Sequence, residues 1–514
     1  MASGKKRSLI LHPVCFAAHP ALFLFSQNVG QLSFASVLPS LLTTLGIASV
    51  AWAALAFALK HAQRAGLIVS LALLLYFSHP HVAATLGMGA PVAILTAVWG
   101  MLFLAGAWLL LRTRKELRAL TQLLNVVGIV VILMSGFEIA RFQLTRGTAE
   151  PPTLPPTVER EVERPAALPD IYFIILDAYA RADVLRELYD FDNGEFLGWL
   201  ERTGFYVADQ AVANYCQTGL TLSSCFNMQY LDEWVKQVGV GSNDHEPLRR
   251  SIRESVLLWE LRQQGYTTVA FSTGQPETEI PTTDIYIPPG VDFESFARAP
   301  VKGDPAVSPY LIPGSKKPFD VFRERIRYIF DHLGRLNALE RSPMFVFAHL
   351  EVPHPPFVFD ADGNDLYPTP EYNDHDGSML IPERFSREEY VAAYRDQLIF
   401  ANRRIKRSIE EILANAPQPP VIVLLGDHGP RSQLVWESAE ETNHWEALGI
   451  LYAVHMPDGD ARGFYPEISP VNTFRILSNR LFGGSHDLLE DRCYFSTADR
   501  LYEFHDVTER ARRR

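Results

Sequence analysis

The chain has 514 residues, more than one ordinary hydrophobic core accommodates, so at least two structural units are expected. Residues 1–148 contain eleven Lys or Arg and only two acidic residues, a balance of +9, whereas the remainder contains 36 basic and 57 acidic residues, a balance of −21. A single soluble domain would not divide in this way. The acidic second part argues against a nucleic-acid partner, because phosphate binding requires a basic face.

The first predicted domain, residues 1–146, is a bundle of about five transmembrane helices. Most of its apolar runs approach the roughly 20 residues that span a bilayer. The runs cover 9–25, 38–59, 66–78, 91–111 and 120–137. Basic loops alternate with loops that lack Lys and Arg, so the positive-inside rule places the N-terminus in the cytoplasm. With an odd number of spans, the residues after Phe142 are expected to lie outside.

A linker is predicted at residues 147–168, where prolines recur among charged residues and resist packing. The second domain, residues 169–514, alternates strand and helix patterns in the manner of an α/β fold. Strand patterns fall at 171–176, 267–272, 344–350, 421–425 and 448–454. Helical patterns fall at 184–203, 251–264, 320–339, 387–415 and 464–482.

Two buried-strand patterns end in side chains that can bind a metal. The run 421–425 leads into Gly426-Asp427-His428-Gly429, and the run 171–176 leads into Asp177. Open α/β sheets bind their ligands at the carboxyl ends of the strands, so these side chains are expected to share one site. A surface turn after each strand is the alternative.

Thr218 lies in a segment rich in small hydroxyl residues that precedes a helical pattern. At a helix N-terminus it would suit a phosphate or sulfate group, and a simple capping role stays open. Thr221, one helical turn later, is the rival nucleophile. Cys216 and Cys225 bracket this segment, and their spacing fits a small disulfide loop or two reduced thiols equally well.

Two histidines follow or precede strand patterns. His354 stands between prolines in the loop after 344–350, and His444 precedes 448–454. Either could reach the site as a positive or hydrogen-bonding group. An ordinary surface position for His354, and packing of His444 against Trp445, are the alternatives.

Together, Asp177, Thr218, Asp427 and His428 form a candidate ligand set for one divalent metal ion. Oxygen and nitrogen ligands suit Zn²⁺ or Mn²⁺ better than Ca²⁺ or Mg²⁺. Metal coordination is one of the few ways to ionise a Thr hydroxyl near neutral pH, so this set predicts nucleophilic catalysis at phosphorus. His354 and His444 would then meet the leaving group and the remaining oxygens.

The order of these motifs resembles the sulfatase-like branch of the alkaline phosphatase superfamily. The membrane helices and linker resemble its membrane-anchored members, the lipid A phosphoethanolamine transferases and the lipoteichoic acid synthases. The resemblance implies a sulfatase-like α/β/α sandwich, Thr218 as nucleophile, and Asp177, Asp427 and His428 as metal ligands. It also implies a multi-pass protein of the cell (inner) membrane whose catalytic domain is periplasmic.

The sequence departs from the sulfatases proper at two places. Cys216 is followed by Gln-Thr-Gly instead of Pro-Ser-Arg, so formylglycine chemistry is not expected. Asp177 is followed by Ala178 where many sulfatases have a second Asp, which favours a single metal.

Three functions follow as hypotheses. The first is a transferase that moves a phospho-substituent, of phosphoethanolamine or phosphoglycerol type, from a membrane lipid donor to a cell-envelope glycan or lipid acceptor. The second is a hydrolase on the same fold, a phosphatase, phosphodiesterase or sulfatase with water as acceptor. The third is a membrane scaffold or transport-associated protein that keeps the fold without the chemistry.

Overall fold

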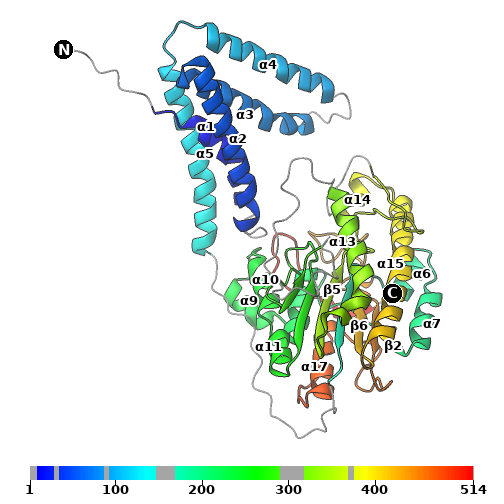
Figure 1. The fold of residues 1–514 in the computed structure, drawn as a ribbon. Helices are drawn as coiled ribbons and strands as arrows, with labels where there is room; N and C mark the ends of the chain where they lie inside the picture. Colours follow the sequence, from blue (N-terminus) through cyan, green and yellow to red (C-terminus); the bar gives the residue numbers. More distant parts are fainter. Residues whose placement is uncertain are drawn as a thin grey trace. The chain divides into compact units, whose positions relative to one another are not determined.

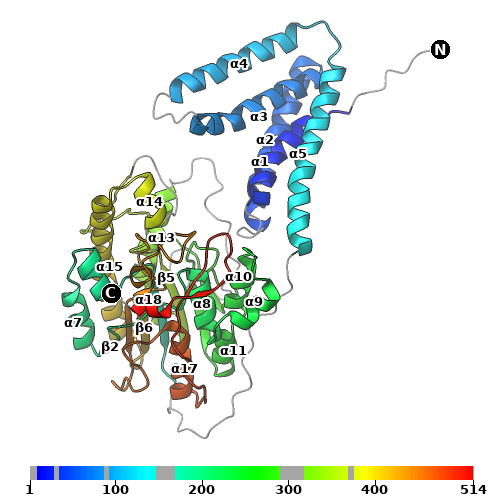
Figure 2. The same ribbon diagram turned by 180° about the vertical axis from the view of Figure 1, so that it is seen from behind.

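The computed structural model describes residues 9–27, 34–85, 92–145, 168–289, 318–368 and 376–512. The chain divides into two compact units, Met1–Arg146 and Gly147–Arg514 (Figures 1 and 2). Apart from Leu168, the predicted linker lies outside the described residues.

The first unit consists of helices packed side by side. They are α1 (His12–Gln27), α2 (Phe34–Leu59), α3 (Ala62–Thr85), α4 (Val92–Arg112) and α5 (Arg118–Thr145). The start of α1 is tied to α5, because the Asn125 side chain accepts hydrogen bonds from the backbone of Leu11 and His12 at 2.9 and 3.0 Å.

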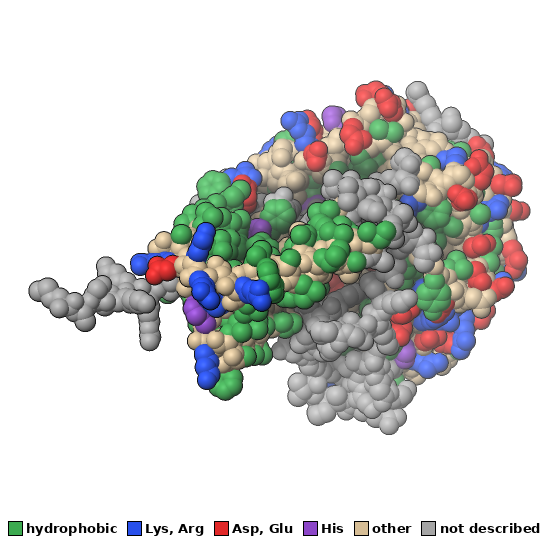
Figure 3. All heavy atoms as spheres, turned by 90° about the horizontal axis from the view of Figure 1, so that it is seen from above, with side chains coloured by type: hydrophobic (Ala, Val, Ile, Leu, Met, Phe, Trp, Pro, Cys, Tyr) green, Lys and Arg blue, Asp and Glu red, His purple; other side chains and the backbone are tan. Residues whose placement is uncertain are grey.

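Among the described residues, three helices are long and apolar enough to cross a membrane, fewer than the five predicted. They lie at Ser40–Leu59, Ile94–Arg112 and Arg118–Arg141. Of the other two, α1 has only 16 residues and contains Pro20, and α3 begins with the polar Gln63 and Arg64. Large apolar side chains stand exposed on α2, among them Val50 at 70% and Phe57 at 87%. Hydrophobic side chains cover much of these helices (Figure 3), as expected of a surface that meets lipid.

The second unit is built on a seven-stranded sheet with the order β2-β7-β6-β1-β5-β3-β4. The strands are β1 (Ile171–Leu176), β2 (Phe205–Val207), β3 (Thr267–Phe271), β4 (Ile285–Ile287), β5 (Met344–Leu350), β6 (Val421–Leu425) and β7 (Tyr452–His455). The central strand β1 runs parallel to both β5 and β6, whereas β7 and β2 add an antiparallel edge. The carboxyl ends of β1, β5 and β6 therefore meet at one edge of the sheet.

The apolar character of the central strands follows from burial on both faces. Tyr172, Ile174 and Leu176 of β1 belong to one core cluster, and Ile171, Phe173 and Ile175 belong to the other. Helices cover both faces (Figures 1 and 2), which makes the unit an α/β/α sandwich.

One core cluster includes residues of α6 (Ala182–Leu188), α7 (Gly194–Arg202), α13 (Pro318–His332) and α15 (Arg387–Asn415). The other includes residues of α8 (Thr218–Asn227), α11 (Val256–Gln263) and α17 (Pro470–Leu481). Smaller elements complete the unit: α9 (Asp232–Val238), α10 (Glu246–Arg253), α14 (Gly377–Glu383), α16 (His444–Leu448), α18 (Thr508–Arg512) and the strand pair β8 (Tyr494–Phe495) and β9 (His505–Asp506).

Several predicted helices differ from those observed. The pattern at 184–203 breaks into α6 and α7, because Asp190 adopts a left-handed backbone with φ of 47°. The pattern at 251–264 is divided by Ser255, whose side chain caps the start of α11. The pattern at 320–339 ends in a 3-10 helix at Leu333–Leu339, and α17 begins later than predicted. The helix at 387–415 is as predicted and starts with a capping box formed by Ser386 and Glu389.

Candidate metal centre

The candidate metal centre lies at the carboxyl ends of β1, β5 and β6. Asp177 directly follows β1, Asp427 and His428 follow β6, and His349 is the penultimate residue of β5. All four side chains are buried. The sheet thus brings together the two acids and His428, as predicted, and adds His349.

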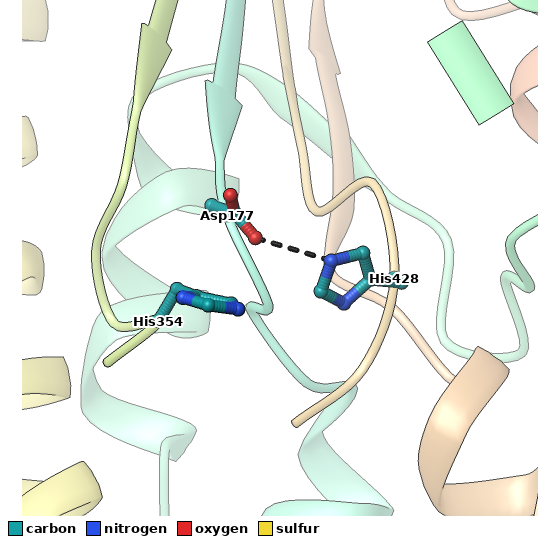
Figure 4. A group of neighbouring side chains, drawn as sticks. All are labelled: Asp177, His354 and His428. Carbon is teal, nitrogen blue, oxygen red and sulfur yellow. Dashed lines mark ion pairs between the residues drawn. The ribbon is translucent and has the colours of Figure 1, made fainter. Parts of the chain in front are cut away.

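Asp177 is the centre of this group. Its Oδ1 lies 3.2 Å from His428 Nε2 (Figure 4), and its Oδ2 lies 3.2 Å from His349 Nε2. Asp427 holds its place through Oδ1, which accepts a hydrogen bond from the backbone N–H of Ala178 at 3.2 Å, while its Oδ2 lies 3.5 Å from His428 Nε2.

The hydrogen bonds of the two histidines fix which nitrogen faces the group. His428 Nδ1 donates to the Gly429 carbonyl at 2.7 Å, and His349 Nδ1 contacts the Thr278 hydroxyl at 2.9 Å. In neutral His428 the other nitrogen, Nε2, then presents a lone pair to the carboxylates. A backbone carbonyl or hydroxyl behind a metal-binding His is the usual way of orienting it.

The ligand atoms that face the centre of the group would be stabilised by a cation. Asp177 Oδ1, Asp427 Oδ2, His349 Nε2 and His428 Nε2 are all buried and have no hydrogen-bond partner in the described part of the chain. Two sets of ligand atoms lie within 4.8 Å of one another, Asp177 with His349 and Asp427, and Asp177 with His354 and His428. Ligands about 2.0–2.1 Å from a Zn²⁺ ion are about 3.3 Å apart in a tetrahedron, close to the 3.2–3.5 Å separations observed. The residues present therefore fit one divalent ion.

Electrostatics keep Asp177 ionised. Burial opposes its charge, but His354, His349 and His428 together outweigh burial and hold the pKa of Asp177 well below its ordinary value. Burial likewise lowers the pKa of His349, and the Asp177 carboxylate more than reverses this effect, so that the pKa is raised.

The turn that carries Asp427 and His428 depends on its glycine at position 429. A Cβ atom added to Gly429 would lie 1.9 Å from the Glu446 carbonyl oxygen, a separation that no side chain tolerates. The close approach of these two backbones is what turns both ligands toward Asp177.

His354 enters from the loop after β5 and is buried next to the group. Its backbone N–H donates to the Asp177 carbonyl at 3.1 Å, and its ring lies 5.9 Å from that of His428 (Figure 4). Gln397 of α15 fixes the loop, since its amide nitrogen donates to the His354 carbonyl at 2.8 Å. The sequence-based alternative, an ordinary surface position, is not what the structure has.

Thr218 is the first residue of α8, and it is partly buried. Its hydroxyl has no hydrogen-bond partner within the described parts of the chain, and its role as a metal ligand stays a prediction. Thr221, in contrast, is buried and its hydroxyl donates to the Tyr215 carbonyl at 3.0 Å. Of the two candidate nucleophiles, Thr218 alone keeps its hydroxyl uncommitted.

An acid lies beside the start of α8. Glu277 accepts a hydrogen bond from Arg249 at 3.1 Å and pairs with His245 at 3.3 Å, and a Cβ on Gly219 would lie 3.3 Å from its Cγ. Burial raises the pKa of Glu277, but His245 and Arg249 outweigh burial and lower it to about 2.

His444 is the first residue of α16, and its ring contacts residues outside the candidate metal centre. Its Nε2 lies 2.7 Å from the Ala439 carbonyl, and its ring packs edge-on against Phe495 at 5.5 Å. Burial lowers the pKa of His444, which leaves the ring neutral. No contact between His444 and the candidate metal centre is found among the described residues.

Cys216 and Cys225 are both free and buried. Burial raises the pKa of the Cys216 thiol to about 12, with Arg431 opposing, so the thiol stays protonated and is a poor nucleophile.

Two functional candidates escaped sequence reasoning. His349 belonged to a run interpreted only as a buried strand, although a polar ring inside such a run is itself a signal, because burial requires a partner. Arg431, which contacts His354, follows the Asp-His-Gly motif in a segment without a recognisable pattern.

These features define an α/β domain with a buried Asp/His group suited to a metal ion, in a chain that also has membrane-type helices. No family model matches the chain, and no curated protein matches it either. Solved structures similar in fold include the zinc complex of the C-terminal periplasmic domain of EcEptC from Escherichia coli, at 14% identity and a TM-score of 0.44, covering 69% of this chain and 96% of that one.

Two further similar structures are a putative sulfatase from Bacteroides thetaiotaomicron and the phosphonate monoester hydrolase of Agrobacterium radiobacter. Each is 14% identical to this chain, with TM-scores of 0.42 and 0.40. The first covers 65% of this chain and 74% of its own, and the second covers 64% and 80%. The comparison therefore concerns the fold alone. At these values it carries no conclusion about reaction, substrate or metal.

Proposed function

We propose that this protein is a membrane-anchored, metal-dependent transferase. It would move a phospho-substituent, of phosphoethanolamine or phosphoglycerol type, from a phospholipid to a cell-envelope glycan or lipid. The observation that carries the proposal is the set of buried ligand atoms on Asp177, Asp427, His349 and His428 that have no hydrogen-bond partner among the described residues. Arg431 connects this group to the start of α8, because it contacts both His354 and the carbonyl of Cys216, two positions before Thr218.

The four ligand residues would hold one divalent ion, and their mixed oxygen and nitrogen donors suit Zn²⁺ or Mn²⁺. Such an ion lowers the pKa of a bound hydroxyl and neutralises charge on a phosphoryl oxygen. His349 would take a ligand position beside Asp177, Asp427 and His428, three of the four ligands that the sequence indicates; the fourth is Thr218.

Thr218 supplies the nucleophile. Its Oγ attacks phosphorus, the lipid alcohol departs with a proton, and the phospho-substituent remains on Thr218 as a phosphodiester. An acceptor hydroxyl then displaces Thr218 and regenerates the free side chain. The nucleophile needs a free hydroxyl. The Thr218 hydroxyl has no hydrogen-bond partner among the described residues, whereas the Thr221 hydroxyl donates to the Tyr215 carbonyl. This difference supports Thr218 as the nucleophile.

The membrane helices support a lipid donor, because an anchored domain meets lipid headgroups at a high effective concentration. The charge pattern of the loops supports an extracytoplasmic position for the domain. We assign His444 no role in the reaction, since its ring contacts Ala439 and Phe495.

The test uses the full chain in lipid vesicles that contain a phospholipid labelled in its headgroup, with an acceptor glycolipid added. The expected result is a labelled peptide that contains Thr218, and label on the glycolipid. Thr218→Ala should abolish both, whereas the exposed control Thr282→Ala should leave both unchanged.

Each outcome separates the hypotheses. Label released only as free headgroup phosphate would replace the transferase with a hydrolase on the same site. A metal-loaded protein that forms no adduct and releases no label would refute the proposed chemistry. A wild-type protein that binds no divalent metal would support the scaffold hypothesis.

A further inference from the structure

Arg431 is a buried cation at the edge of the candidate metal centre. Its side chain reaches three segments that are distant in sequence. Nη2 lies 3.1 Å from His354 Nε2, Nη1 donates to the Cys216 carbonyl at 3.1 Å, and Nε lies 3.5 Å from Asp376 Oδ2. The residue is 8% exposed, so its charge is kept largely out of water.

The backbone of Arg431 is in the left-handed region, with φ of 56°. For a residue with a Cβ this conformation costs about 1–2 kcal/mol, whereas glycine adopts it freely. Strained non-glycine residues concentrate at functional sites, where the side chain is needed in spite of the strain. The strain therefore points to a role for the guanidinium beyond holding the turn.

Both ring nitrogens of His354 are engaged. Nδ1 contacts the Pro355 carbonyl at 2.6 Å and must donate to it, and Nε2 accepts from Arg431. His354 therefore offers no N–H to a substrate, and the positive charge on this side of the site belongs to Arg431. The ring holds the guanidinium in place.

The guanidinium keeps capacity for an anion. It carries five N–H groups in a planar fork. Among the described residues, Nη1 and Nη2 each use one N–H, toward Cys216 and His354, and Nε has no hydrogen-bond partner. One N–H on Nη1 and one on Nη2 therefore remain. Several donors on one planar cation match the oxygens of a phosphate or sulfate group better than a lysine does.

Arg431 also lies beside the start of the helix that carries Thr218. Cys216, whose carbonyl accepts from Arg431, precedes Thr218 by two positions, and the N-cap residue Gln217 makes no side-chain cap. The first backbone N–H groups of a helix attract anions. The buried guanidinium and the helix start therefore favour negative charge in the same place.

We propose that Arg431 binds the tetrahedral anionic group of the substrate, a phosphoryl or sulfuryl group, beside Thr218. This inference rests on the proposed function and names a residue of the same site. Arg431 contacts two oxygens of the group, and His354, Cys216 and Asp376 orient the guanidinium.

The test measures anion binding by the metal-loaded full chain in detergent, with inorganic phosphate and inorganic sulfate as separate probes in calorimetry. Arg431→Gly suits the left-handed backbone and so preserves the turn. Its affinity should fall at least about 10-fold, the size of a lost hydrogen bond to a charged group. Added guanidinium ion at millimolar concentration should restore binding, and Arg431→Lys should retain only part of it. Arg403→Gln, at a 57% exposed arginine of α15, is the control and should bind as the wild type does.

Metal content is measured on every variant. Unchanged anion affinity in Arg431→Gly, with metal retained, overturns this inference and leaves the proposed function standing. Loss of metal together with anion, without rescue by guanidinium, makes Arg431 a structural clamp and also overturns it. Failure of the wild type to bind metal defeats the proposed function itself. A preference for phosphate over sulfate, lost in Arg431→Gly, supports phosphoryl chemistry at the site, and the reverse preference supports a sulfatase.

Discussion

Replacing Asp427 with Asn should stabilise the metal-free protein and weaken metal binding at the same time. Asp427 is fully buried, its Oδ1 accepts from Ala178, and its Oδ2 has no hydrogen-bond partner and lies 3.5 Å from His428 Nε2. In Asp427→Asn the amide oxygen can keep the Ala178 hydrogen bond. The amide nitrogen can then donate to His428 Nε2. In the wild type, two hydrogen-bond acceptors, Asp427 Oδ2 and His428 Nε2, face each other at this place.

The magnitude follows from the unpaired atoms. A buried polar atom without a partner costs about 1–3 kcal/mol, so metal-free Asp427→Asn should gain about that much. With an unfolding entropy of about 2 cal/mol/K per residue, the melting temperature of the second unit should rise by about 1–4 °C. Metal affinity should fall at least about 100-fold, because even residues that only support a ligand contribute 10- to 100-fold.

The assay is thermal unfolding of the full chain in detergent, with a chelator and with Zn²⁺ in excess. A ligand at 100 times its dissociation constant stabilises by about 2.7 kcal/mol, so Zn²⁺ should raise the melting temperature of the wild type and leave Asp427→Asn almost unchanged. The stability advantage of Asp427→Asn seen with chelator should therefore fall by about 2 kcal/mol in Zn²⁺. The 74% exposed Asp362, changed to Asn, serves as control and should follow the wild type. A metal-free Asp427→Asn that melts below the wild type, or binds Zn²⁺ equally well, would refute the reasoning.

Three further predictions concern the surroundings of the site. Gly429→Ala would place a Cβ 1.9 Å from the Glu446 carbonyl, so the turn must shift and Zn²⁺ content by mass spectrometry should drop sharply, although the helical circular dichroism is expected to persist. Thr221→Val should lower the free energy of unfolding by about 1–3 kcal/mol in urea, because a buried carbonyl loses its donor, yet should leave covalent labelling of Thr218 intact; loss of labelling would revive Thr221 as the nucleophile. The pKa of Glu277 is lowered from 4.5 to about 2 by its two basic partners. These partners therefore contribute about 3 kcal/mol of stability, which is fully present above pH 4.5 and is lost as the pH falls toward 2. Glu277→Gln should remove this change in stability between pH 4.5 and pH 2.

The parts of the fold that sequence could predict are those whose pattern is set by burial alone. The strands that became β1, β5 and β6 are continuous apolar runs, because both of their faces are covered, and their bounds match the prediction closely. The three-residue strands β2 and β4 carry no such pattern and were missed. The strand predicted at 448–454 starts too early, because the short helix α16 ends at Leu448 and β7 begins only at Tyr452.

The residues of the candidate site also differ in how far the sequence could predict them. Asp177, Asp427 and His428 were predictable because parallel strands place their carboxyl ends at one edge. His349 was not predicted, because a continuous apolar run is interpreted as a buried strand even when it contains one polar ring. Arg431 could not be found from sequence at all, because its position depends on three contacts that only the folded chain creates.

The metal-binding group is assembled from the first, fifth and sixth strands along the chain, and the hydrogen bond between Ala178 and Asp427 joins residues 249 positions apart. Closing so long a loop is slow relative to local pairing. During synthesis, Asp177 emerges well before its partners and carries an unneutralised charge until strand β6 docks. If the group binds an ion as proposed, its capture would therefore be a late event in the maturation of the domain, and a chain truncated before residue 428 would lack at least the His428 ligand.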